Sequence, residues 1–170
     1  IYLLLGLYLA YHLHAVKTFS NNFVGIGTQR KSFLTSVKST YKKLPQNIIF
    51  FTQSDTAYYG MPENEKILPV QVGFGKILMI WYQKDEQFPG CLYEGQFLLK
   101  ILEQGYKECD GRGFGYARKY DTLLKLLNDN ALTGNNVIAY NWNSKKREFS
   151  DITKEIRAKV AGDLQYEASQ

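Results

Sequence analysis

The first sixteen residues form the longest apolar stretch of the chain, with no charged side chain and only two strongly polar ones, His12 and His14. Residues this apolar need either a membrane or a deep core. A membrane-spanning helix needs about 20 apolar residues, so the pattern predicts a transmembrane helix truncated at its N-terminal end. A buried helix and a signal peptide are the alternatives, although the basic leading region and small-residue cleavage site of a signal peptide are missing.

A pattern with helical spacing follows this stretch. Thr28 is a suitable N-cap for a helix that runs to about Lys43. Its apolar face consists of Phe33, Leu34, Val37, Tyr41 and Leu44. A basic stripe on another side consists of Lys31, Lys38 and Lys42. The stripe indicates either a solvated face or contact with anionic lipid headgroups, for which each Lys near the surface contributes about 1 kcal/mol.

Short apolar runs then alternate with helical patterns. The predicted strands cover residues 48–51, 67–72, 105–109 and 137–142, with a turn at 143–146 and a return strand at 147–149. The predicted helices cover residues 76–82, a segment capped by Tyr120 and Asp121 and followed by Gly134, and a last segment from Asp151 or Thr153 through Val160. This alternation predicts a small layered α/β domain with a short mixed sheet.

The predicted organisation has three parts. They are a partial transmembrane helix (residues 1–20), a soluble α/β domain (residues 21–160) and a polar tail (residues 161–170). With 170 residues, 45% of them hydrophobic, the chain is long enough for one domain with a real core plus an anchor.

Positive charge is concentrated near the N-terminus. No acidic residue precedes Asp55, whereas six of the 21 basic residues do, so the remainder carries 15 basic and 16 acidic residues and a net charge of −1. The overall charge of +5 therefore describes a basic segment after the apolar one. This distribution does not indicate a nucleic-acid partner. The chain also lacks the aromatic-basic interleaving on which nucleic-acid bases stack.

A glycine-rich run, residues 111–115, resembles a phosphate loop at first sight. The dinucleotide-binding spacing would require glycine at position 116, which is Tyr116, and the Lys-Ser/Thr of a P-loop is missing. We interpret the run as a structural turn before the Tyr120 helix. A loop in which Arg112, Tyr116 and Arg118 contact an anionic ligand is the alternative.

Other chemistry is sparse. Both histidines lie in the apolar stretch, so Ser/His/Asp and Cys/His catalysis are excluded for the remaining chain and we identify no catalytic residue. Cys91 and Cys109 fit no zinc pattern, and no metal or cofactor is expected. Outside the cytoplasm the two cysteines could form a disulfide, and inside it they would be buried thiols.

Five short pieces carry a resemblance to a known group of proteins: residues 44–45 (Leu-Pro), 73–75 (Gly-Phe-Gly), 104–107 (Gln-Gly-Tyr-Lys), 113–116 (Gly-Phe-Gly-Tyr) and 151–153 (Asp-Ile-Thr). Over residues 27–157 the chain resembles the C-terminal domain that follows the last transmembrane helix of bacterial polytopic membrane proteins. Those proteins look like lipid-linked-sugar glycosyltransferases related to protein O-mannosyltransferases and aminoarabinose transferases. The resemblance implies a polyprenyl-phosphate sugar donor and a catalytic acid in an outer loop that this sequence does not contain.

The leading hypothesis is therefore a non-catalytic, extracytoplasmic C-terminal domain of such a membrane glycosyltransferase, with membrane lipid as partner. The basic residues beside the apolar stretch favour the cytoplasmic side instead, although that rule is weak for long domains. A single-span anchored module that binds a ligand or partner without enzymatic activity is the first alternative. A cytoplasmic peripheral protein, with its first helix in the core and its basic helix on anionic lipid, is the second.

Overall fold

The structure, a computed structural model, describes residues 2–55, 89–92, 104–146 and 148–168. Its helices are α1 (Tyr2–Thr40), α3 (Tyr120–Asp129) and α4 (Thr153–Ala168), with short 3-10 turns η1 (Gly90–Leu92) and η3 (Gly134–Asn136). Its strands are β1 (Asn47–Ser54), β2 (Gly105–Cys109), β3 (Arg112–Ala117), β4 (Val137–Asn143) and β5 (Glu148–Asp151). The predicted strand over residues 67–72 and the predicted helix over 76–82 lie outside the described residues.

A mixed five-stranded sheet forms the centre of the domain, in the order β2-β3-β1-β4-β5. Strand β1 pairs in parallel with β3 and β4, whereas the edge strands β2 and β5 are antiparallel to their neighbours. The expected α/β class with a mixed sheet is thus confirmed.

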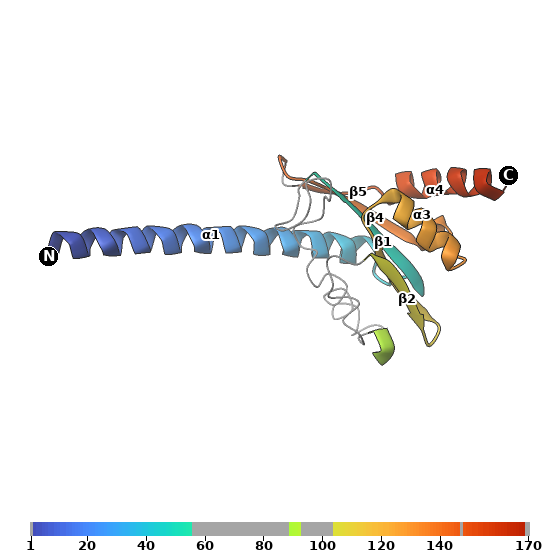
Figure 1. The fold of residues 1–170 in the computed structure, drawn as a ribbon, viewed down its shortest axis with the longest axis horizontal. Coiled ribbons are helices and arrows are strands. Elements are labelled where there is room, and N and C mark those ends of the chain that lie inside the picture. The colour runs from blue at the N-terminus through green and yellow to red at the C-terminus, as the bar shows by residue number, and fades with distance from the viewer. Residues whose placement is uncertain (1, 56–88, 93–103, 147, 169–170) are drawn as a thin grey trace.

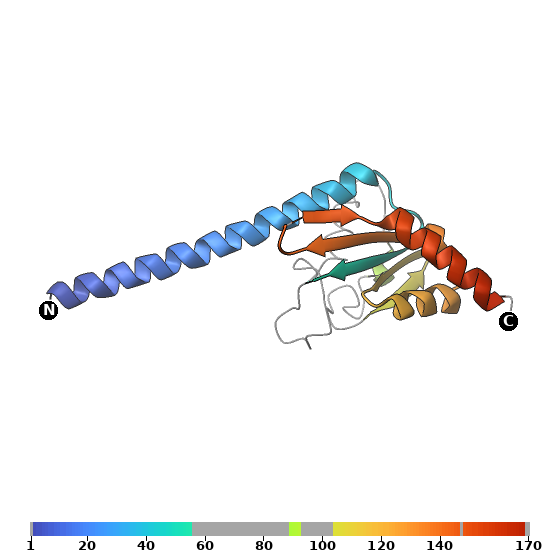
Figure 2. The same ribbon diagram turned by 90° about the horizontal axis from the view of Figure 1, so that it is seen from above.

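Strand β1 is buried on both faces of the sheet, which explains its continuous apolar run. Ile48 and Phe50 pack in a core cluster with the end of α1, because alternate side chains of a strand point to the same face. Ile49 and Phe51 point the other way and pack with α3 and α4. The sheet is therefore the middle of three layers (Figures 1 and 2).

Helix α1 is much longer than the sequence pattern predicts. It runs without a break through Thr28, which is not an N-cap: its hydroxyl donates to the carbonyl oxygen of Val24 at 2.8 Å, as in a helix interior. The helix ends at Thr40 and not at Lys43. It also crosses the predicted boundary between residues 20 and 21. Only its C-terminal end is buried on the domain, where Phe33 and Val37 are fully covered.

The predicted transmembrane helix is not supported. Among the residues that the structure describes, no helix combines the length and apolar character needed to cross a membrane. The tyrosines, the two histidines and Lys17 dilute the apolar run of α1.

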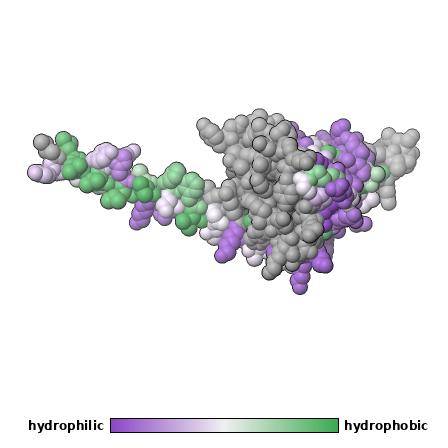
Figure 3. All heavy atoms as spheres, turned by 90° about the horizontal axis from the view of Figure 1, so that it is seen from below, coloured by the Kyte–Doolittle hydropathy of each residue, from purple (hydrophilic) through white to green (hydrophobic). Residues whose placement is uncertain are grey.

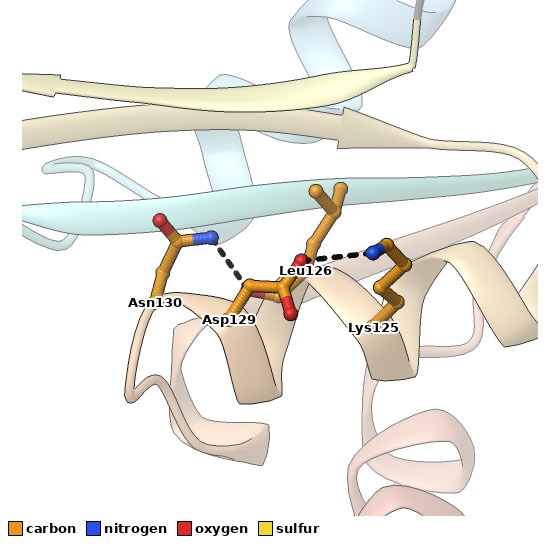
Figure 4. Close-up of polar contacts among 4 residues, drawn as sticks. All are labelled: Lys125, Leu126, Asp129 and Asn130. Carbon is orange, nitrogen blue, oxygen red and sulfur yellow. Dashed lines mark hydrogen bonds and ion pairs between the residues drawn. The ribbon is translucent and has the colours of Figure 1, made fainter.

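The ends of α3 and α4 also differ from the prediction. Helix α3 ends at Asp129, where the side-chain amide of Asn130 donates to the carbonyl oxygen of Leu126 at 2.8 Å (Figure 4). Ala131 then adopts a positive φ of 52°. An exposed ion pair, Lys125 with Asp129 at 3.3 Å, lies on the same turn (Figure 4). Gly134, expected to stop this helix, instead begins η3.

Helix α4 begins at Thr153, one of the two predicted starts, and continues past Val160 to Ala168. A contact between helices accompanies this extension: the Tyr120 hydroxyl donates to the Asp163 carboxylate at 2.7 Å, and the Lys159 ammonium lies 3.8 Å from the Tyr120 ring centroid. Burial, followed by the hydrogen bond to Asp163, raises the pKa of Tyr120 above its usual value.

The attachment of α1 gives a stability prediction. Replacing Phe33, which is fully buried, with Ala leaves a cavity and should lower the free energy of unfolding by about 3–5 kcal/mol. Phe19→Ala is the matched control, because Phe19 is 65% exposed on the same helix and its loss should change stability by under about 0.5 kcal/mol. Chemical denaturation followed by tryptophan fluorescence measures both. Equal effects of the two substitutions would contradict the attachment.

Candidate functional site

The projecting part of α1 is the most exposed apolar surface among the described residues. Figures 1 and 2 show this part of the helix extending beyond the sheet, away from α3 and α4. Its exposed large apolar side chains are Tyr2, Leu3, Leu4, Leu5, Leu7, Tyr8, Leu9, Tyr11, Leu13, Val16, Phe19, Phe23 and Val24. Hydrophobic and polar residues alternate along it in Figure 3. A patch of this size on a folded protein marks an interaction surface.

Three consecutive parts of α1 have different surroundings. Residues 2–16, the uncharged segment, are exposed and contain no Asp, Glu, Lys or Arg. Residues 17–32, the spacer, are more polar, and every side chain described there is also exposed. The docked end begins at Phe33, the first buried residue among the described side chains of the helix. At a rise of about 1.5 Å per residue, the spacer separates the uncharged segment from the domain by about 24 Å.

The basic stripe predicted for lipid contact belongs to the domain side of this helix. Lys31 is exposed at the end of the spacer, Lys38 is half-buried on the docked end, and Lys42 is exposed just beyond the helix. None of the three lies beside the uncharged segment. The apolar face opposite them is confirmed, since Phe33, Leu34, Val37 and Leu44 are buried and Tyr41 packs against the same core.

A surface pocket of about 570 Å³ lies where the end of α1 meets the start of α4. The Tyr41 hydroxyl lies 3.0 Å from the Thr153 hydroxyl oxygen and 3.3 Å from the Asp151 carboxylate. Thr153 is held in place by β4, because its hydroxyl accepts from the Ala139 backbone N–H at 2.9 Å. Asp151 accepts from the Thr153 backbone N–H at 2.8 Å and so caps the helix.

The pocket is lined by both charged and apolar side chains. Lys154, Glu155 and Arg157 line it beside Ile152. Partial burial raises the pKa of Tyr41 above its usual value, and the hydrogen bond to Thr153 opposes that rise. The phenol is therefore neutral at physiological pH, and it is suited to hydrogen bonding with a ligand rather than to base catalysis. The sequence contains an Asx-type cap signal at Asp151, but nothing in it connects that signal with Tyr41.

The predicted anion-binding set is not gathered at one place. Arg112 opens β3 and lines a second pocket with Asp110, whereas Tyr116 lies near the other end of the strand, about 13 Å away at the usual rise per residue. Tyr116 accepts a 3.4 Å hydrogen bond from the Thr52 hydroxyl. Arg118 follows the strand and is 8% exposed, with its backbone N–H donating to the Gln104 side chain at 2.6 Å.

The glycine-rich run is part of a β-hairpin and not a turn before α3. Asp110 and Gly111 have φ values of 50° and 71° and connect β2 to β3 as a two-residue turn, for which Asp-Gly is a favoured sequence. Gly113 and Gly115 lie within β3 beneath the Tyr106 ring, and a Cβ on either would overlap it. Burial, followed by the hydrogen bond to Glu108, raises the pKa of Tyr106. The glycines thus serve packing, and the Asp-Gly signal was missed.

A disulfide joins Cys91 of η1 to Cys109 at the end of β2, with a Cα–Cα distance of 6.4 Å. Leu92, the neighbour of Cys91, is fully buried in the core that contacts α1. The bond therefore holds η1 against the sheet edge. Within the described parts of the chain, no group of three or more His, Cys, Asp or Glu side chains could hold a metal ion.

Comparison with known proteins finds no matching family model, no similar curated protein and no matching solved structure. The fold is that of a three-layer α/β domain with a projecting N-terminal helix. The exposed helix and the pocket at Tyr41 are the surfaces that bear on its function.

Close packing at β3 gives a second prediction. A Cβ at position 115 would lie 3.0 Å from both the Gly105 carbonyl oxygen and Ile49 Cγ1, so Gly115→Ala should destabilise the domain by about 1–3 kcal/mol. Gly90→Ala is the control, because nothing lies within 4 Å of that position. Denaturation midpoints of the two variants test this, and a Gly115→Ala midpoint equal to that of the parent chain would contradict the packing.

The disulfide gives a third prediction. Mass spectrometry of the unreduced protein should find the peptides of Cys91 and Cys109 covalently linked. Two free thiols would contradict it. The bond closes a segment of 18 residues, so replacing both cysteines with Ser should lower the free energy of unfolding by about 3 kcal/mol.

Proposed function

We propose that this chain is a non-catalytic α/β domain that α1 anchors to a membrane. One observation carries the proposal: the N-terminal half of α1 leaves the domain and exposes large apolar side chains from Tyr2 to Val24. Exposing this much apolar surface to water is costly, at about 25 cal/mol for each Å² that could be buried. The helix therefore requires an apolar environment that the described part of the domain does not supply.

Lipid is the environment that best suits the uncharged segment. Leu3, Leu4 and Leu5 are consecutive and all exposed, so apolar side chains surround the helix instead of forming one stripe. A helix that is hydrophobic all round belongs in a membrane or in the core of a large protein. Residues 2–16 cover about 22 Å of the roughly 30 Å of a bilayer core, so this segment would occupy much of the depth of that core.

The disulfide supports an extracytoplasmic location for the domain. Disulfides persist in oxidising compartments and are rare in the cytosol. The bond between Cys91 and Cys109 holds a core residue in place, so it contributes to the fold itself. This argument favours the outside placement over the cytoplasmic one that the basic residues near the anchor suggest.

The resemblance to lipid-linked-sugar glycosyltransferases supplies a finer proposal for the whole protein. There, sugar would be transferred from a lipid phosphate carrier by residues that this sequence does not contain, and the present domain would assist acceptor binding or assembly. A membrane anchor is common to this proposal and to its alternative.

The alternative is an anchored binding module without enzymatic activity, and the pocket at Tyr41 favours it. Hydroxyl, carboxylate and cationic groups line a concave surface there, and a concave site with a few placed polar groups suits a small ligand. A pocket of this kind serves an acceptor-binding domain equally well.

The anchor is tested by adding one charge to it. Leu9→Lys should weaken binding of the full chain to phosphatidylcholine vesicles on the order of a hundredfold, because a Lys in the bilayer core costs about 3 kcal/mol more than a Leu. Thr35→Lys is the matched control: it adds the same charge at an exposed position of the docked end and should leave binding unchanged. Vesicle co-sedimentation measures both. Equal binding by Leu9→Lys and the parent chain would contradict the anchor.

A further inference from the structure

The N-terminal third of the chain is suited by charge to an anionic surface. Residues 1–54 contain no Asp or Glu, so no carboxylate on α1 competes for its lysines. Lys17 is the first charged side chain of the sequence and is exposed immediately after the uncharged segment. Its helical neighbours one turn away are Leu13, His14, Ser20 and Asn21, none of which is acidic.

The continuity of α1 fixes how far each basic residue lies from the anchor. Measured along the axis, Lys31 is about 21 Å and Lys38 about 31 Å beyond Lys17, at about 1.5 Å per residue. Charges are screened over about 8 Å at physiological ionic strength. When the uncharged segment enters a bilayer end-on, Lys17 reaches the phosphates and the predicted basic stripe does not.

The distribution of apolar side chains selects this end-on arrangement. A helix that lies flat on a membrane has one apolar face and one polar face. The uncharged segment has no single polar face: Leu3, Leu4 and Leu5 point in three directions and all three are exposed, and its two strongly polar residues, His12 and His14, do not share a helix face. A flat helix would leave part of that surface in water, whereas an inserted helix buries all of it.

We propose that the anchor prefers membranes with anionic phospholipid headgroups and that Lys17, not Lys31, Lys38 or Lys42, makes the headgroup contact. This inference rests on the proposed membrane anchor and adds the class of lipid it recognises. The spacer then holds the α/β domain, whose first buried residue is Phe33, about 24 Å from the headgroups. The basic residues of the docked end then lie in solvent or contact the domain itself.

The test compares single Lys→Gln variants of the full chain on two kinds of vesicle, phosphatidylcholine alone and phosphatidylcholine mixed with phosphatidylserine. Gln is a good helix former, so each variant removes one charge and keeps the helix. Lys17→Gln should weaken binding to the mixed vesicles about fivefold, the effect of one Lys at the surface. Its binding to the neutral vesicles should stay unchanged. Lys31→Gln and Lys38→Gln, the matched controls, should change binding to the mixed vesicles by under about twofold.

Each other outcome has a distinct meaning. Equal losses for Lys17→Gln and Lys31→Gln would show a helix lying flat and overturn the assignment to Lys17. Equally tight binding of the parent chain to both vesicles would overturn the lipid preference and leave the anchor intact. Absence of binding to either vesicle would overturn the anchor and the inference together, and self-association in the same samples would then identify a second copy of the chain as the apolar partner.

Discussion

The packing of Phe33 against the sheet joins the two halves of this molecule, because it determines where α1 stops being part of the domain. The Phe33 ring lies 5.1 Å from that of Tyr140 on β4 and 4.5 Å from that of Phe149 on β5. Phe149 in turn contacts Trp142 at 4.3 Å. This aromatic cluster covers one face of the sheet and holds the last turns of α1. Everything N-terminal to it projects, since a continuous helix extends in the direction that its docked end imposes.

The packing of α1 on the sheet also connects the projecting helix with the pocket at Tyr41. Tyr41, one turn beyond Val37, hydrogen-bonds the first residue of α4, so the end of α1 also forms one wall of the polar pocket. A change at the docked end would therefore alter both the direction of the projecting helix and the groups that line the pocket. The disulfide acts on the same core, because it positions η1, whose buried Leu92 belongs to the core cluster that includes Phe33.

The described residues that the sequence offered as candidates for ligand chemistry mostly serve the fold. The glycines of β3 accommodate the Tyr106 ring, the Asp110-Gly111 turn closes a hairpin, and the three anion-binding candidates are distributed along a strand. The most distinctive surface is the apolar helix, and the polar pocket is the second. These two surfaces are the ones on which the proposed attachment and binding rest.

The amino-acid sequence by itself determined the elements whose signals are local. The apolar run around Phe50 defined a buried strand, the spacing of Leu123 and Leu127 defined α3, and the positions of Phe33 and Val37 defined the docked face of α1. Each follows from a periodicity that burial imposes on consecutive residues. An Asp-Gly turn is also local, so the hairpin at Asp110 was within reach and was missed.

Only the tertiary structure decided which of these elements meet. The meeting of Tyr41 with Thr153, more than a hundred residues later, depends on how α1 and α4 pack at the same end of the sheet. The separation of Arg112 from Tyr116 depends on their shared strand being extended. The distance from Lys17 to the domain depends on one unbroken helix, because Gly25 and Gly27 lower its intrinsic stability without ending it. Periodicity specifies the buried face of an element, whereas contacts between elements depend on packing that no single stretch of sequence contains.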